Sequence, residues 1–134
     1  MKCDYAARAV LSLARHYSTG RAVRVETLAK EQSIPQNYLV QILIELKAGG
    51  IVRSQRGKEG GYLLDRDPSE VTMGDVLQCI HGSVFEPPKG DSPCPEELSQ
   101  RWQQIQSAVD DAAQAISFKQ IVDSVGQDQE MYYI

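Results

Sequence analysis

The segment from residue 35 to residue 64 constrains the fold most, because a helical apolar pattern leads directly into a short hairpin pattern. Pro35 suits a first helical turn and Gly49-Gly50 end the pattern, so a helix is predicted between them. Its buried stripe has four members: Leu39, Ile42, Leu43 and Leu46. The opposite face, at about 100° per residue, also has four: Asn37, Gln41, Ile44 and, at its edge, Val40. A shorter helical stretch, "VETLAKEQSI", comes just before, and the pair predicts a helix-turn-helix.

Two stretches after this helix, "IVRSQ" and "YLLD", are strand-like, and "RGKEGG" between them is a glycine-containing hairpin connection. A hairpin directly after a helix-turn-helix is a wing. The predicted fold class is therefore mainly α with a small β-hairpin wing, a winged helix-turn-helix. A phosphate cradle is excluded because the glycines lack Walker spacing. A dinucleotide fingerprint fails as well, since it needs a helix where the second strand stands.

The remaining pattern supplies further helices. Residues 4–17 form one whose buried face extends to Tyr17, and Thr72 caps another that stops at Gly82. Residues 82–95 contain four prolines and two glycines, which rules out regular structure. We expect four parts: a winged-helix domain over 1–82, a loop over 83–95, a long helix over 96–116, and a C-terminal helix and tail over 117–134.

The helix predicted over 96–116 carries a narrow apolar seam with alternating spacings of four and three residues. Its members are Leu98, Trp102, Ile105, Val109, Ala112 and Ile116. Such spacing is typical of a coiled-coil seam rather than of the wider stripe on a globular surface helix. The seam predicts a dimerisation helix. Packing against its own domain is the alternative that the pattern leaves open.

Charge is divided unevenly along the chain. The net charge is −4, made of ten Lys and Arg against five Asp and Glu in residues 1–62 (+5), and four against thirteen in residues 63–134 (−9). A basic half can meet phosphates while an acidic half is held away from them, although chance could also produce these counts. No apolar run approaches the roughly 18 residues of a membrane span, and the three cysteines are irregularly spaced. A cytoplasmic protein is expected.

An outward amide pair followed by a basic hairpin favours DNA binding over a merely solvated turn. Asn37 and Gln41 can each bond adenine bidentately in the major groove, and Val40 can contact a thymine methyl group. Arg56 and Lys58 stand on the wing turn, where they can reach phosphates or enter a minor groove.

Four stretches together resemble the Rrf2 family of winged-helix regulators: "DYAARAVLSLA", "IPQNYLVQILIELKAGGIV", "SQRGKEGGYLL" and "VTMGDVLQCIHG". The family includes iron–sulfur regulators, nitric-oxide sensors and cluster-free cysteine-metabolism repressors, and the chain is most similar in character to the last. The resemblance implies a homodimer with crossed long helices that binds double-stranded promoter DNA at a pseudo-palindromic site. Val40 stands where iron–sulfur members often have a glutamate, so a different preferred site is expected. The expected DNA-contacting residues are Lys2, Gln36, Asn37, Val40, Gln41, Arg53, Arg56, Gly57, Lys58 and Gly60.

The cysteines of this chain differ from those of the cluster-binding members of the family. The resemblance implies that such members supply three cysteines from the loop before the dimer helix. Here that loop has only Cys94, while Cys3 and Cys79 lie in or at predicted helices, so no iron–sulfur cofactor is expected. A redox role for Cys94 stays open, because a helix N-terminus favours thiol reactivity whereas the nearby carboxylates oppose it. No enzyme is predicted, since His16 and His81 lie far apart without a nucleophile or carboxylate set around them.

The C-terminal "EMYYI" resembles the end of the cysteine-metabolism repressors, which pair with cysteine synthase. One hypothesis docks Ile134 in that enzyme's substrate pocket; the alternative, which its apolar residues favour, packs the tail onto its own domain. The predicted function is a homodimeric transcriptional repressor. The alternatives are an iron–sulfur or thiol-based redox-sensing regulator that uses Cys94 and a protein-interaction module that regulates an enzyme such as cysteine synthase through the tail.

Overall fold

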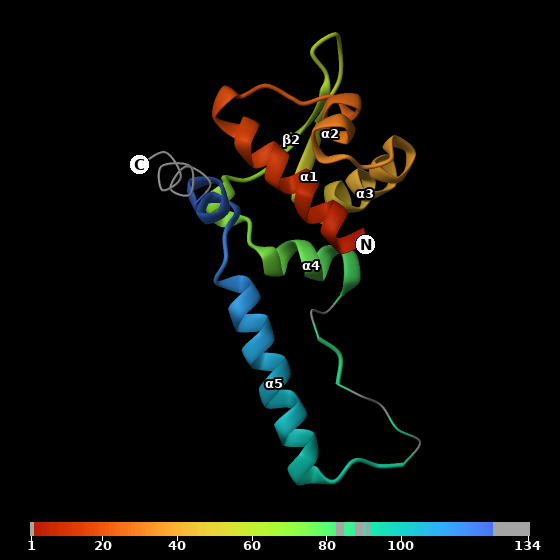
Figure 1. Ribbon diagram of the computed structural model, residues 1–134, viewed down its shortest axis with the longest axis vertical. Helices are drawn as coiled ribbons and strands as arrows, with labels where there is room; N and C mark the ends of the chain where they lie inside the picture. Colours follow the sequence, from red (N-terminus) through yellow and green to blue (C-terminus); the bar gives the residue numbers. More distant parts are fainter. Residues whose placement is uncertain (1, 83–84, 88–89, 91, 125–134) are drawn as a thin grey trace.

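The computed structural model describes residues 2–82, 85–87, 90 and 92–124. Its elements in chain order are α1 (Lys2–His16), η1 (Tyr17–Thr19), α2 (Val25–Gln32), α3 (Gln36–Ala48), β1 (Val52–Gln55), β2 (Gly61–Leu64), η2 (Pro68–Glu70), α4 (Met73–His81) and α5 (Glu96–Gln114). Residues 118–124 are also helical. The predicted class, mainly α with one antiparallel hairpin, is confirmed. In Figure 1, α1 to α4 and the hairpin form one body, and α5 projects from it, so the hairpin turn and α5 lie at opposite ends.

The core lies where α1 contacts α2, α3 and α4. Ala6 and Ala9 of α1 are fully buried, and such small side chains let neighbouring helices approach closely. The predicted apolar stripe of α3 is confirmed, because all four of its members have 0% exposure: Leu39, Ile42, Leu43 and Leu46. Burial of each such side chain contributes about 1.5–3 kcal/mol. The stripe therefore anchors α3 firmly while its other face stays free.

Local signals bound α3 and α4 where predicted. Pro35 precedes α3, which stops before Gly49. At α4, the Thr72 hydroxyl accepts a hydrogen bond from the Asp75 backbone N–H at 3.0 Å, and the Asp75 carboxylate accepts one from the Thr72 N–H at 3.1 Å. This capping box satisfies two N–H groups that have no partner within the helix. Gly82, with φ 88°, ends α4 in a conformation that favours glycine.

Two elements end earlier than predicted. α1 stops at His16 and the chain turns into η1, so Tyr17 is 37% exposed instead of continuing the buried face. α5 stops at Gln114, so Ile116 lies outside the helix that was expected to extend over 96–116. The Ile116 carbonyl accepts a hydrogen bond from the Met73 N–H at 2.8 Å, and Phe118 is buried at 1% exposure. The periodicity of the sequence could not predict that α5 ends at Gln114. The residues that follow α5 form hydrogen bonds with Val71 and Met73, which lie far away in the sequence.

The α5 seam is only partly covered by the described part of its own chain. None of the described residues of α5 is buried: Leu98 and Ile105 are 49% and 44% exposed. Trp102 is half-buried and stacks on Phe85, with ring centroids 6.3 Å apart. The α5 seam consists of Leu98, Trp102, Ile105, Val109 and Ala112. Among the described helices, none is both long enough and apolar enough to cross a membrane.

Candidate nucleic-acid interface

The free face of α3 has the composition that the sequence predicted. Gln36, Asn37 and Gln41 are exposed, and Val40 is half-buried at the edge of the face. The Asn37 side-chain oxygen accepts a hydrogen bond from the Tyr38 backbone N–H at 3.1 Å. That bond occupies one acceptor, while the amide N–H₂ groups and the whole Gln41 side chain remain available to a base edge.

An apolar hollow lies beside these amides, a feature that the sequence reasoning missed. Its volume is about 480 Å³, and it is lined by Tyr5, Pro35, Asn37, Tyr38 and Gln41. The rings of Tyr5 and Tyr38 meet edge to face with centroids 5.6 Å apart, and Tyr38 is 40% exposed. A helical wheel could have found Tyr38, which precedes Gln41 by three residues on α3. Its contact with Tyr5 depends on the packing of α1 against α3.

The hairpin follows α3, its strand β1 contacts that helix, and its tight turn projects from the body (Figure 1). β1 and β2 pair in the register Val52↔Leu64 to Gln55↔Gly61. Gly57 has φ 109°, and the Gly60 N–H donates to the Gly57 carbonyl at 3.0 Å. A Cβ on Gly60 would come within 2.5 Å of the Gln55 carbonyl oxygen. The glycines of the motif are therefore needed to close the turn, whatever the turn contacts.

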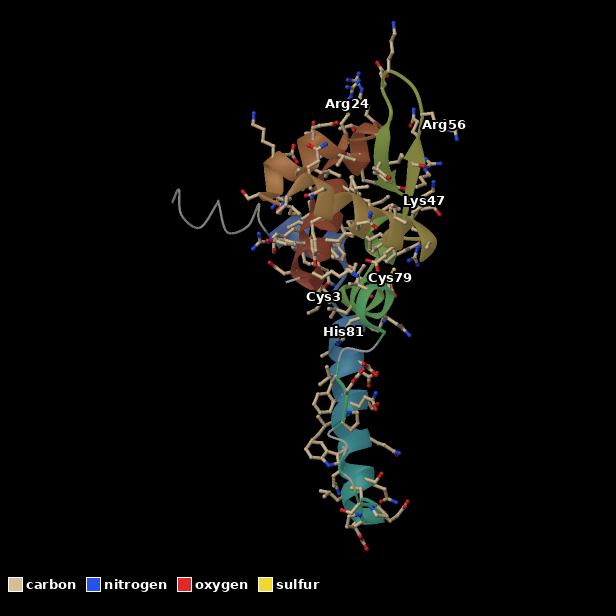
Figure 2. All side chains as sticks on the ribbon, turned by 90° about the vertical axis from the view of Figure 1, so that its right-hand side faces the viewer. Cys3, Arg24, Lys47, Arg56, Cys79 and His81 are labelled. Carbon is tan, nitrogen blue, oxygen red and sulfur yellow. The ribbon has the colours of Figure 1, made fainter. Side chains whose placement is uncertain are left out.

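Cationic side chains surround this turn. Arg56 and Lys58 are exposed on it, and the Lys47 ammonium of α3 donates to the Ser54 hydroxyl of β1 at 2.8 Å. Figure 2 shows Arg24, Arg56 and Lys47 around the hairpin. Arg24 precedes α2, Arg56 lies on the turn, and Lys47 belongs to α3. Sequence reasoning identified the two wing residues but missed Lys47 and Arg24. Lys47 could have been found, since it follows the outward Ile44 by three residues on the same helix.

Two expected DNA-contacting residues are placed apart from this surface. Arg53 pairs with Leu63, one position along from Ser54, so its side chain leaves the hairpin on the opposite face from Lys47. There Arg53 lines a cavity of about 320 Å³ together with Tyr17 and Arg21. The alternation of strand side chains therefore separates Arg53 from the free face of α3, and its contact with DNA stays a prediction.

The second residue placed apart is Lys2, whose ammonium forms an ion pair with Glu45 at 2.8 Å. This hydrogen bond raises the pKa of Lys2 above its ordinary value of 10.5. The charge of Lys2 is thus already matched by a carboxylate of α3. Both groups remain more than a third exposed, so the pair contributes little to stability.

The cysteines do not form a metal site within the part of the chain that the structure describes. No group of three His, Cys, Asp or Glu side chains there is arranged to hold a metal ion. The Cys79 thiol donates to the Glu45 carbonyl at 3.3 Å, and burial raises the pKa of Cys79, so the neutral form is favoured. Cys94 is exposed in the loop before α5, and Cys3 lies on α1. Since clusters are held by thiolates, this donor set does not fit one.

A serine, a glutamate and a histidine come together between α1 and α2, which the sequence reasoning did not expect around His16. The buried Ser12 hydroxyl donates to the Glu31 carboxylate at 2.5 Å, and the His16 Nε2 lies 3.3 Å from the other Glu31 oxygen. Catalysis of the serine–histidine type needs a hydrogen bond between those two residues. Here both contact the carboxylate instead. The cluster ties α2 to α1 and thereby supports the helix-turn-helix.

Comparison with known proteins agrees with this geometry. The model of the Rrf2 family, described as an iron-dependent transcriptional regulator, matches residues 1–124. The chain belongs to the Rrf2 family. The predictions of this family and of a winged-helix transcriptional regulator are confirmed.

Different relatives in the family align with different portions of this chain. Rv1287 of Mycobacterium tuberculosis is 45% identical over 95 residues, which cover 69% of this chain and 58% of that relative. The transcriptional regulator CymR of Bacillus subtilis is 26% identical over 98% of this chain and 94% of its own length. Among solved structures, T. potens IscR superposes with a TM-score of 0.79 at 25% identity, covering 99% of this chain and 94% of that one. Staphylococcus aureus CymR superposes with a TM-score of 0.71 at 27% identity, covering 88% and 92%.

Proposed function

We propose that α3 lies in the major groove of a promoter duplex while the wing contacts the adjoining backbone. The observation that carries this proposal is that Asn37 and Gln41 are both exposed on the free face of a helix whose other face is fully buried. A rigid helix holds its side chains in place against base edges, and amides can read adenine there. Arg56 and Lys58, on the turn of the hairpin that follows α3, supply the phosphate contacts that fix the register.

The active form proposed here is a homodimer in which the α5 seams of two copies cover one another. Exposed apolar area on a projecting helix supports this, since a seam of this spacing is suited to a helical partner. Ile116 is not included, because it lies outside α5. Two copies related by a twofold axis present two α3 helices to two half-sites, which implies a pseudo-palindromic operator.

The proposed regulator is a cytoplasmic repressor that works without an iron–sulfur cluster. The support is the donor set, in which Cys79 is held neutral and no further cysteine lies near Cys94 in the described loop. Anaerobically purified protein, assayed for iron and sulfide, should be colourless and metal-free and should still bind its operator. A brown protein with stoichiometric iron would contradict the proposal. The redox role of Cys94 and the docking of Ile134 on cysteine synthase stay predictions, and Ile134 lies outside the described residues.

The DNA-binding surface is tested by selecting preferred sites from a random duplex library with three proteins: wild type, Gln41→Ala and Lys58→Ala. Gln41→Ala should relax the preference at one base position per half-site, at a cost of about 1–3 kcal/mol. Lys58→Ala should weaken all sequences alike and reduce the salt slope of the binding constant by about 0.9 for each phosphate that the lysine neutralises in the wild type.

Lys119→Ala is the matched control for the lysine, because it removes the same charge from the exposed surface of residues 118–124. It should leave binding unchanged. If Gln41→Ala altered neither the affinity nor the base preference, α3 would not be the reading helix.

A further inference from the structure

The wing is attached to the connection between α1 and α2 as well as to its own strands. The Val23 N–H donates to the Tyr62 carbonyl at 2.7 Å, and the Tyr62 N–H donates to the Val23 carbonyl at 2.8 Å. Gly61, with φ 150°, lies so close that a Cβ there would overlap the Val23 carbonyl. β2 is therefore bordered by β1 on one edge and by residue 23 on the other.

The next residue, Arg24, extends this attachment to the tip of the wing. Its backbone is extended and precedes the first turn of α2, but its side chain makes no capping hydrogen bond there. Instead the guanidinium donates from Nη2 to the Lys58 carbonyl. Figure 2 shows Arg24 beside the hairpin, on the side away from Lys47.

The turn over residues 56–60 has few other restraints. Strand pairing ends at Gln55↔Gly61, and one backbone hydrogen bond closes the turn, from the Gly60 N–H to the Gly57 carbonyl. Within the described residues, the bond from Arg24 is the one side-chain hydrogen bond to this turn from outside the hairpin. Lys47 holds β1 lower down, at Ser54. The orientation of the turn therefore depends on Arg24.

We propose that Arg24 is a positioning residue that holds the wing turn so that Arg56 and Lys58 meet the DNA backbone together. This inference rests on the proposed DNA binding. A free turn would have to be ordered when DNA binds, and that loss of conformational freedom opposes association. A turn that is already held by Arg24 avoids most of this cost. The acceptor is a backbone carbonyl, so the restraint persists when the Lys58 side chain is shortened.

A double-mutant cycle separates this role from direct contact between Arg24 and a phosphate. Arg24→Ala is measured in the wild type and in an Arg56→Ala/Lys58→Ala background, on one fixed duplex at one salt concentration. In the wild type it should weaken binding about fivefold to tenfold, the size expected for removal of one ordinary exposed hydrogen bond. In the background it should weaken binding less than about twofold, because the turn then carries no cation to position. Equal losses in both backgrounds would overturn the proposal in favour of a phosphate contact.

Hydrogen exchange of the free protein gives a second test that does not use DNA. Arg24→Ala should speed exchange of the amides in residues 57–60 and leave those of α3 unchanged, which also shows that the fold is intact. Arg21→Ala is the matched control, since Arg21 is exposed in the same connection. Unchanged exchange in the turn would overturn the positioning role. A wild type that bound no duplex would overturn the proposed function and this role together, whereas binding without any effect of Arg24→Ala would overturn only the latter.

Discussion

α3 and α5 are both amphipathic helices, yet the chain treats their apolar faces in opposite ways. α3 is 13 residues long and buries four aliphatic side chains completely; α5 is 19 residues long and buries none of its described residues. α3 lies between α1, α4 and β1, whereas α5 projects from the body (Figure 1). An apolar face that the described part of its own chain leaves largely exposed indicates a surface built for a partner.

Charge follows the same division. Arg56 and Lys58 stand on the wing turn and Lys47 contacts β1 of the same hairpin, while α5 begins with Glu96 and Glu97. The hairpin turn and α5 lie at opposite ends of the molecule, so the carboxylates are far from any phosphates that the wing meets (Figure 1). Interactions between exposed charges are largely screened beyond about 8 Å at physiological salt. The acidic helix therefore does not oppose DNA binding, and the net charge of −4 misleads as a guide to partners.

The largest expected effect contrasts a leucine in each helix. Leu43→Ala in α3 should lower the free energy of unfolding by about 2–5 kcal/mol at any protein concentration, because it leaves a cavity in the core. Leu98→Ala in α5 should destabilise mainly through the dimer, so its effect should depend on protein concentration. Chemical denaturation at two concentrations measures both. A concentration-independent loss at Leu98 would show that its own chain covers the seam.

A charge in the α5 seam should separate the dimer without unfolding the body. Ile105→Asp should produce a monomer of about the 14.9 kDa chain mass and weaken operator binding roughly a hundredfold, since two half-sites are no longer held together. Gln103→Asp is the matched control, because that residue is exposed about 200° away around the helix. Light scattering and DNA titration give the readouts. If the two variants behaved alike, the seam would not be the interface.

The smallest expected effect concerns two of the three thiols, those of Cys79 and Cys94. Cys94 should react with iodoacetamide faster than Cys79 near neutral pH, because Cys94 is exposed while burial raises the pKa of Cys79 above its ordinary value of 9.0. Because the pKa of Cys79 is raised, its thiolate forms mainly in alkaline solution. The difference in alkylation rate between Cys94 and Cys79 should therefore narrow as the pH rises. Mass spectrometry of the alkylated protein checks this order, and Cys94→Ser should remove the fast reaction. Faster alkylation of Cys79 would contradict its placement between α3 and α4.

Local patterns in the sequence determined most of the helix bounds, the wing and the free face of α3. The stripe of α3, the capping of α4 by Thr72 and the glycines of the turn involve residues within a few positions of one another, so spacing alone can express them. The exposure of Asn37 and Gln41 follows from the same helical period. These features were predictable because the physics that produces them is local.

Only the tertiary structure decided which charged side chains lie at the wing and which contacts they make. Arg53 and Arg56 are three residues apart, yet Arg53 faces the cavity beside Tyr17 while Arg56 stands on the turn. Arg24 reaches the Lys58 carbonyl across 34 positions, and Lys2 pairs with Glu45 across 43. No period in a sequence encodes contacts at such separations, because they form only after the core has brought the elements together.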